Sequence, residues 1–142
     1  MATYQEIYQS YLVLSDEELV SIGKDAHAVL LQELSKVYQT EQEILDKYIK
    51  IVGSFICIDG TVNQVEYEMF SLISGIKFSY DDFLDIFKTN TSESSITVVD
   101  NIIDFLDGNG KYAAIVLGLV LCASNGHMSE EEQKLIEKFI EE

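Results

Sequence analysis

The chain has 142 residues, enough for one domain that buries about two-thirds of its unfolded surface. Its 25 acidic residues far outnumber its 9 basic ones, which are all Lys, so the formal net charge is −16. This charge repels phosphate backbones and anionic lipid, and we therefore expect no nucleic acid partner. It favours divalent cations or a basic protein surface, although solubility alone is sufficient reason for an acidic chain.

The N-terminal residues 1–6 have neither the basic flank nor the apolar run of a secretion signal, so we expect a cytoplasmic protein. Its two cysteines, Cys57 and Cys122, lie in apolar runs without metal-ligand spacing, and are expected to be reduced core residues without a chemical role. The longest apolar run, 113–123, is shorter than the roughly 20 residues that span a bilayer. It predicts a buried core helix and no direct membrane insertion.

The absence of Pro and the helical spacing of apolar residues predict an all-α fold, a compact bundle of seven or eight short helices. The helices are expected at 3–12, 16–38, 41–58, 64–76, 80–88, 95–106, 111–124 and 129–141. Within them, 44–58 and 112–124 are apolar on nearly every face and are expected at the centre of the bundle. Gly118 lies inside the second of these, where it indicates a close helix crossing.

Capping boxes, in which a hydroxyl or amide side chain and a Glu three residues later satisfy the first backbone N–H groups of a helix, mark four helix starts. They pair Ser15 with Glu18, Thr40 with Glu43, Asn63 with Glu66, and Ser129 with Glu132. Apolar stripes predict the buried faces. The stripes are Leu19, Ile22, Ala26, Val29, Leu30 and Val37; then Val65, Met69, Leu72, Ile73 and Ile76; then Ile96, Val99, Ile103 and Leu106.

The most informative feature is an internal repeat, in which residues 55–66 recur as residues 121–132. Each unit is an apolar stretch, an Asp-Gly or Asn-Gly dipeptide, an apolar residue, and a Glu seven residues after the Asp or Asn. Both units predict a helix–turn–helix hairpin. We therefore expect the bundle to be built from two related helical-hairpin halves.

Two interpretations of the repeated turn stay open. In the first, the dipeptides are structural turns, and Glu66 and Glu132 act only as capping partners. In the second, the spacing matches the later half of an EF-hand calcium loop. The first ligand positions of such a loop are apolar here, which excludes an ordinary EF-hand. What remains is a weak Ca²⁺ or Mg²⁺ site at Asp59 and Glu66, with a weaker counterpart at Asn125 and Glu132.

Other chemistry finds little support in the sequence. The segment 107–110, Asp-Gly-Asn-Gly, looks like a calcium loop, but Phe105 and Val116 would occupy ligand positions, so it is expected to be a loop that ends the preceding helix. Neither His27 nor His127 has a nucleophile at a recognisable spacing. We therefore expect a protein that is not an enzyme.

With these residues the chain resembles the TerB-like family of bacterial tellurite-resistance and stress proteins, a domain shared with the N-terminal region of some membrane-anchored J-domain co-chaperones. The carrying residues are Ile58-Asp59-Gly60-Thr61-Val62 with Glu66, and residues 121–132 leading into Lys134-Leu135-Ile136. The resemblance covers roughly residues 44–140. It implies a compact helical domain without established catalysis, whose acidic turn residues bind divalent cations, here Asp59, Glu66 and then Glu132. Asn125 departs from the family's Asp.

The resemblance implies a single TerB-like domain over 1–142, with N-terminal helices at 1–39 that match no family motif and a repeat-containing core at 41–142. The expected function is weak divalent-cation binding within a bacterial stress-response or membrane-associated protein assembly. The alternative is a protein–protein interaction module without a metal site, whose acidic face docks a basic partner.

Overall fold

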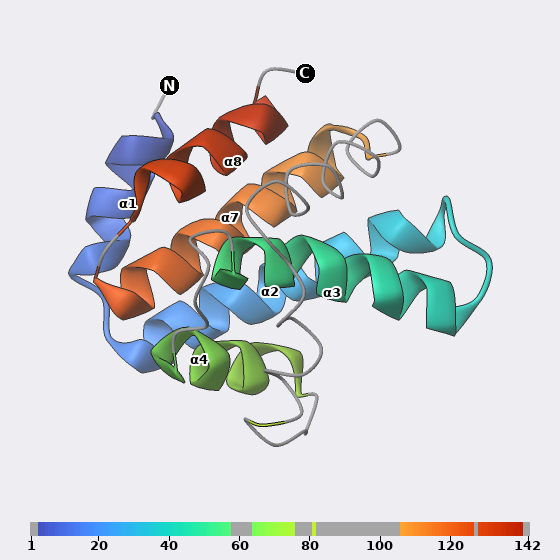
Figure 1. Ribbon diagram of the computed structural model, residues 1–142, viewed down its shortest axis with the longest axis horizontal. Coiled ribbons are helices and arrows are strands. Elements are labelled where there is room, and N and C mark those ends of the chain that lie inside the picture. The colour runs from blue at the N-terminus through green and yellow to red at the C-terminus, as the bar shows by residue number, and fades with distance from the viewer. Residues whose placement is uncertain (1–2, 58–63, 76–80, 82–105, 127, 141–142) are drawn as a thin grey trace.

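The computed structural model describes residues 3–57, 64–75, 81, 106–126 and 128–140. Every regular secondary-structure element among these residues is an α-helix, which confirms the all-α prediction (Figure 1). The helices are α1 Tyr4–Leu12, α2 Asp16–Ser35, α3 Glu41–Cys57, α4 Gln64–Ser74, α7 Gly108–Asn125 and α8 Glu130–Ile140. The helices expected at 80–88 and 95–106 fall almost wholly outside the described residues. The described part therefore has six helices rather than seven or eight, and the two related halves stay a prediction.

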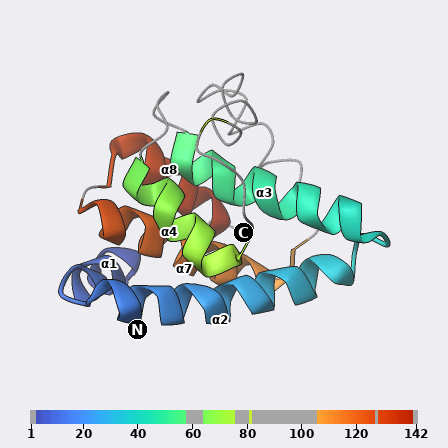
Figure 2. The same ribbon diagram turned by 90° about the horizontal axis from the view of Figure 1, so that it is seen from below.

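Helix α7 lies at the centre and packs against each of the five other described helices (Figures 1 and 2). Almost every side chain from Ala113 to Ala123 is buried. A helix that is apolar on all sides can only be accommodated inside a bundle, because any exposed face would leave apolar surface in water. The structure thus confirms the central position expected for 112–124.

Helix α3 is not central, contrary to the prediction for 44–58. Its inner face is buried through Tyr48, Ile51 and Phe55, but Leu45 is 41% exposed and Asp46 is exposed beside it. The polar residues in the first half of this helix need water, so one side of α3 faces solvent. The helix is amphipathic and lies at the side of the bundle (Figure 2).

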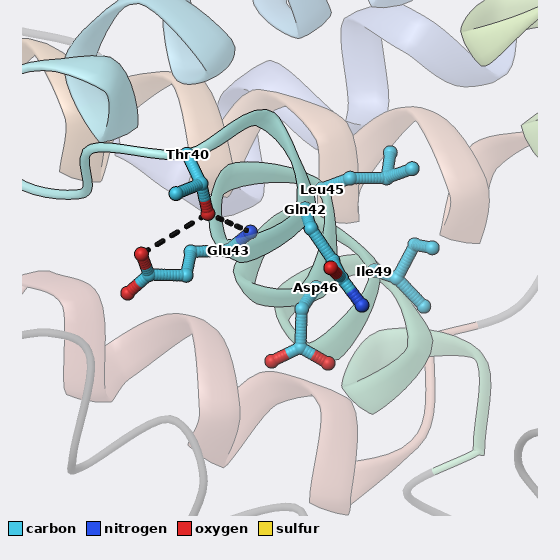
Figure 3. Close-up of a pocket in the computed structure, with 6 residues that line it drawn as sticks. All are labelled: Thr40, Gln42, Glu43, Leu45, Asp46 and Ile49. Carbon is cyan, nitrogen blue, oxygen red and sulfur yellow. Dashed lines mark hydrogen bonds between the residues drawn. The ribbon is translucent and has the colours of Figure 1, made fainter.

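The predicted caps at Ser15 and Thr40 are confirmed. Ser15 Oγ accepts from the backbone N–H of Glu18 at 3.2 Å, and the Glu18 carboxylate accepts from the Ser15 backbone N–H at 3.2 Å. At α3, Thr40 Oγ1 accepts from the Glu43 backbone N–H at 3.1 Å and donates to the Glu43 carboxylate at 3.0 Å (Figure 3). The Asn63 cap lies outside the described residues.

Helix α7 begins three residues earlier than predicted, at Gly108. Asp107 is its N-cap, and Asp107 Oδ1 accepts from the backbone N–H of Gly110 at 3.0 Å. The segment 107–110 is therefore a helix start and not the irregular joint that its glycines suggested. An N-cap aspartate satisfies a backbone donor that would otherwise have no partner, and this outweighs the low helix propensity of glycine.

Gly118 brings α7 close to α3, as the sequence indicated. A Cβ atom at this position would lie 2.5 Å from Cε1 of Phe55, well inside van der Waals contact. The Phe55 ring is itself held against Phe139 of α8, with ring centroids 6.0 Å apart. Glycine is required here because the ring of Phe55 occupies the space that a side chain would fill.

In the part of the chain that the structure describes, no helix is both long enough and apolar enough to cross a bilayer. Two parts of the surface are candidates for a functional site. One is the end of α7, where the second copy of the repeat forms a turn, and the other is the grooves beside the helices.

Candidate functional site

The second copy of the repeat forms the helix–turn–helix that the sequence predicted. Helix α7 ends at Asn125, and Gly126 follows with φ of 77°, the left-handed conformation that glycine adopts without strain. The Gly126 backbone N–H donates to the carbonyls of Cys122 at 2.9 Å and Ala123 at 3.1 Å. Helix α8 then begins directly after Ser129.

Glu132, the predicted ligand in this turn, is 2% exposed and has both carboxylate oxygens bonded within the protein. Oε1 accepts from the backbone N–H of Ser129 at 2.9 Å, and Ser129 Oγ accepts from the Glu132 backbone N–H at 3.1 Å. Oε2 accepts from the thiol of Cys122 at 2.9 Å. Glu132 therefore closes a complete capping box and joins α8 to α7.

Cys122 is the residue of this turn that sequence reasoning missed. It was expected to be an inert core residue, and it is indeed fully buried, but its thiol is a donor to a buried carboxylate. Burial raises the pKa of Tyr8 in α1, and its electrostatic interactions with Cys122 and with Glu132 raise that pKa further. A capping Glu accepts a backbone N–H with one oxygen, and its second oxygen needs another donor when the side chain is buried. A donor in the preceding helix was therefore the sequence signal for this hydrogen bond.

For the other three predicted ligands the structure describes no side chain. Asp59 lies outside the described residues. Glu66 is the third residue of α4 and Asn125 the last of α7, but the structure does not describe their side chains. Within the described ranges, no group of three or more His, Cys, Asp and Glu side chains is placed to hold a metal ion.

A groove of about 610 Å³ runs between α2 and α7 and ends at α1. Helix α7 packs against both α2 and α1 (Figures 1 and 2). The apolar lining of the groove is Ile22, Ala26 and Val29 from α2 and Tyr112, Ala113 and Val116 from α7. Val29 belongs to a stripe predicted to face the core, yet it is 38% exposed, and Tyr112 is 59% exposed. The groove thus presents apolar surface to solvent.

Charged side chains gather at the end of this groove where α2 finishes and α7 starts. Lys36 Nζ lies 3.0 Å from Oε1 and 3.1 Å from Oε2 of Glu33, which is 7% exposed. Bonding to Glu33 raises the pKa of Lys36, and the nearby carboxylate of Asp107 raises it further. The pKa of Asp107 is lowered, chiefly by its bond from Gly110. Lys36 therefore lies near two carboxylates, those of Glu33 and Asp107.

A second hollow, of about 430 Å³, lies along the outer side of α3. Figure 3 shows Gln42, Leu45 and Ile49 projecting from one side of this helix, while Glu43 turns back to Thr40. All its described lining comes from this one helix and its cap residue. A hollow with one described wall defines no binding geometry.

His27, which has no nucleophile at a recognisable spacing in the sequence, forms a hydrogen bond inside the bundle. Its Nδ1 lies 2.7 Å from the hydroxyl of Tyr48, and the two rings pack edge to face with centroids 4.9 Å apart. Burial lowers the pKa of His27 and raises the pKa of Tyr48. The neutral imidazole can then accept from the protonated phenol, so this pair fastens α2 to α3. His127 lies outside the described residues.

Comparison of the chain with protein-family models, with curated proteins and with solved structures yields no match. The TerB-like resemblance is therefore carried by the residues of the repeat alone. The function has to be inferred from the site geometry and the charge of the chain.

Proposed function

We propose that this protein is a helical interaction module that binds a basic protein partner. The observation that carries this proposal is the solvent-facing apolar groove between α1, α2 and α7, in which Tyr112 is 59% exposed and Val29 is 38% exposed. Exposed aromatic and aliphatic side chains in a concave surface are typical of interaction sites.

The net charge supports a basic partner. A chain with a formal charge of −16 attracts positively charged surfaces over long range and repels acidic ones, which accelerates encounter with the first class and suppresses the second. The attraction between exposed charges is screened by salt. Binding is therefore expected to weaken as the ionic strength rises.

The geometry at Glu132 supports a function that does not require a metal ion at the second turn. Both oxygens of this carboxylate already accept hydrogen bonds from the protein, and a cation that displaced either bond would leave the Ser129 backbone N–H or the Cys122 thiol without its acceptor. Leaving a buried donor without a partner costs about 1–3 kcal/mol. Glu132 is better explained as a fold-determining residue.

The proposal is tested by affinity capture. The purified protein is immobilised, exposed to an extract of the organism that encodes it, and eluted either with NaCl or with EDTA. The proposal expects a partner, identified by mass spectrometry and rebound as a purified protein, that NaCl releases and EDTA does not. A rebound partner that EDTA releases, or one that is acidic and insensitive to salt, would contradict it.

A second proposed function is weak Ca²⁺ or Mg²⁺ binding at the first turn, in the stress-response or membrane-associated assembly that the TerB-like resemblance implies. The specific observation is that Ile56 stands in the first unit where Cys122 stands in the second. The first unit thus has no thiol at the position from which Cys122 donates to Glu132. Asp59 also carries a negative charge that Asn125 lacks.

This second proposal is tested by titrating the chelator-stripped protein with Ca²⁺ and then Mg²⁺, monitored by backbone amide NMR, beside the Asp59→Asn variant. Saturable shifts confined to residues 59–66 and lost in the variant would support it. Diffuse shifts that do not saturate would contradict it.

A further inference from the structure

The groove between α2 and α7 has the form of a seat for a helix. Ile22, Ala26 and Val29 follow one another along α2 at spacings of four and three residues, so they share one face. On α7, Val116 lies four residues after Tyr112 and three after Ala113, so it shares a face with each of them. Two facing stripes of this kind form a trough whose walls run parallel to the helix axes, which is the shape that receives an amphipathic helix.

The trough fits a helix of about two to four turns. Its lining extends along α2 from Ile22 to Lys36, about 21 Å at the rise of an α-helix, and along α7 from Asn109 to Val116, about 10 Å. Tyr11 of α1 closes one end, and the pair of Glu33 and Lys36 lies towards the other. An extended peptide of that length would leave most of its backbone donors and acceptors without partners against helical walls, so a helix is the better occupant.

The apolar lining supplies an anchor point in the middle of the trough. Val29 and Tyr112 are the exposed members, whereas Ala113 is 3% exposed and Val116 is 6% exposed. Small buried residues beside larger exposed ones leave a depression that an incoming leucine-sized side chain would fill. Tyrosine is among the residues that contribute most to binding at interface centres.

The charges along the trough select a basic helix. Asp25 of α2 is exposed in its lining, and Glu33 lies further along the same helix. Lys36 is the one basic residue among the described residues that line the groove, and its charge is matched by Glu33, with Asp107 also near. The carboxylates therefore exceed the ammonium groups, and an incoming acidic face would be repelled.

We propose that this groove binds an amphipathic helix with leucine-like side chains on one face and Lys or Arg on its flanks. This inference rests on the proposed interaction function and names the class of its partner. A second copy of the chain is a poor occupant, because two copies of charge −16 repel each other.

The experiment is an amide NMR titration of the full chain with a synthetic amphipathic peptide of Lys and Leu, about four helical turns long. A scrambled peptide of the same composition, which cannot place its leucines on one face, is the matched control for charge. Two groove variants, Tyr112→Ser and Val29→Ser, are compared with Leu72→Ser, since Leu72 of α4 is also 59% exposed but lies outside the groove. Dispersed spectra and thermal unfolding establish that each variant is folded.

The proposal expects saturable shifts at the lining residues of α2 and α7 with the amphipathic peptide. Binding should be at least about tenfold weaker for the scrambled peptide and for each groove variant, and unchanged in Leu72→Ser. Equal binding of both peptides, or shifts spread over the acidic surface, would overturn it. So would groove shifts that grow with protein concentration alone, which would identify a second copy as the occupant.

Failure here is distinguishable from failure of the interaction function itself. A purified partner that binds in a salt-sensitive way equally to wild type and to both groove variants would retain the proposed function and remove this groove from it.

Discussion

The thiol of Cys122 donates a hydrogen bond of 2.9 Å to Oε2 of Glu132 across the second repeated turn, and both residues are buried. The same carboxylate receives the backbone N–H of Ser129 through its other oxygen. One side chain thus fixes the start of α8 and its attachment to α7. The turn that resembles half of a calcium loop is held together by protein donors.

Glu132→Ala is expected to lower the free energy of unfolding by about 1–3 kcal/mol, because the part-buried Ser129 N–H and the buried Cys122 thiol lose their acceptor. Urea unfolding followed by circular dichroism measures it. Glu131→Ala is the matched control, since Glu131 is exposed in the same helical turn and its removal should change stability by less than about 0.5 kcal/mol. Equal losses in the two variants would show that Glu132 acts only through the helix dipole.

The contact between Cys122 and Glu132 predicts a coupling energy in a double-mutant cycle. Cys122→Ala and Glu132→Gln, made singly and together, should give a non-additive change in unfolding free energy of at least about 0.5 kcal/mol, as expected for residues in contact. The same cycle between Cys122→Ala and Glu131→Gln should be additive. Additive effects in both cycles would mean that the thiol contributes only its volume.

Gly118→Ala is expected to destabilise the protein by about 1–3 kcal/mol, because the new methyl group meets the ring of Phe55, which is packed against Phe139. Gly108→Ala is the control: it is also in α7, and a Cβ there meets no atom within 4 Å. That variant should be neutral or stabilised by up to about 1 kcal/mol. Thermal and urea unfolding measure both. A tolerated alanine at 118 would refute the close helix crossing.

His27 predicts a pH dependence of stability. Its pKa is lowered in the folded protein, chiefly by burial, so the unfolded chain binds more protons as the pH falls below the ordinary value of 6.5. The stabilisation is therefore present above that value and lost as the solution becomes more acidic. Between about pH 7.5 and about pH 5.5, the free energy of unfolding should fall more in wild type than in His27→Asn.

The shared titration of the many carboxylates cancels in that comparison, because both proteins carry all of them. The asparagine offers an amide oxygen near the position of Nδ1, so the bond from Tyr48 can be retained. An identical pH dependence in the two proteins would show that His27 is protonated as readily in the folded bundle as in the unfolded chain.

Local chemistry made much of the fold predictable from the sequence. The hydroxyl and Glu pairs at Ser15 and Ser129 gave helix starts, because a cap is decided by residues three positions apart. The all-apolar run of α7 gave the centre of the bundle. The start of α7 was mistaken because Asp107 was followed by two glycines, and the N-cap bond that decides the matter is seen only in three dimensions.

The sites were less predictable, since they depend on contacts between distant segments. Periodicity placed Val29 on an inward stripe, but the stripe on α2 is wider than the surface that α7 covers, so its edge faces solvent. Likewise the hydrogen bond between Cys122 and Glu132 joins two helices, so it depends on how α8 packs against α7, and the second oxygen of the capping Glu was its one signal in the sequence.

We propose that this acidic bundle binds a basic amphipathic helix through charge and an apolar groove, without a metal ion. Calorimetric titration with the amphipathic Lys and Leu peptide, at about 50 and about 500 mM NaCl and with either EDTA or Mg²⁺, tests it most directly. We expect the affinity for the peptide to fall about tenfold or more at the higher salt and to be the same with EDTA as with Mg²⁺. Binding that is indifferent to salt, or that requires Mg²⁺, would contradict it.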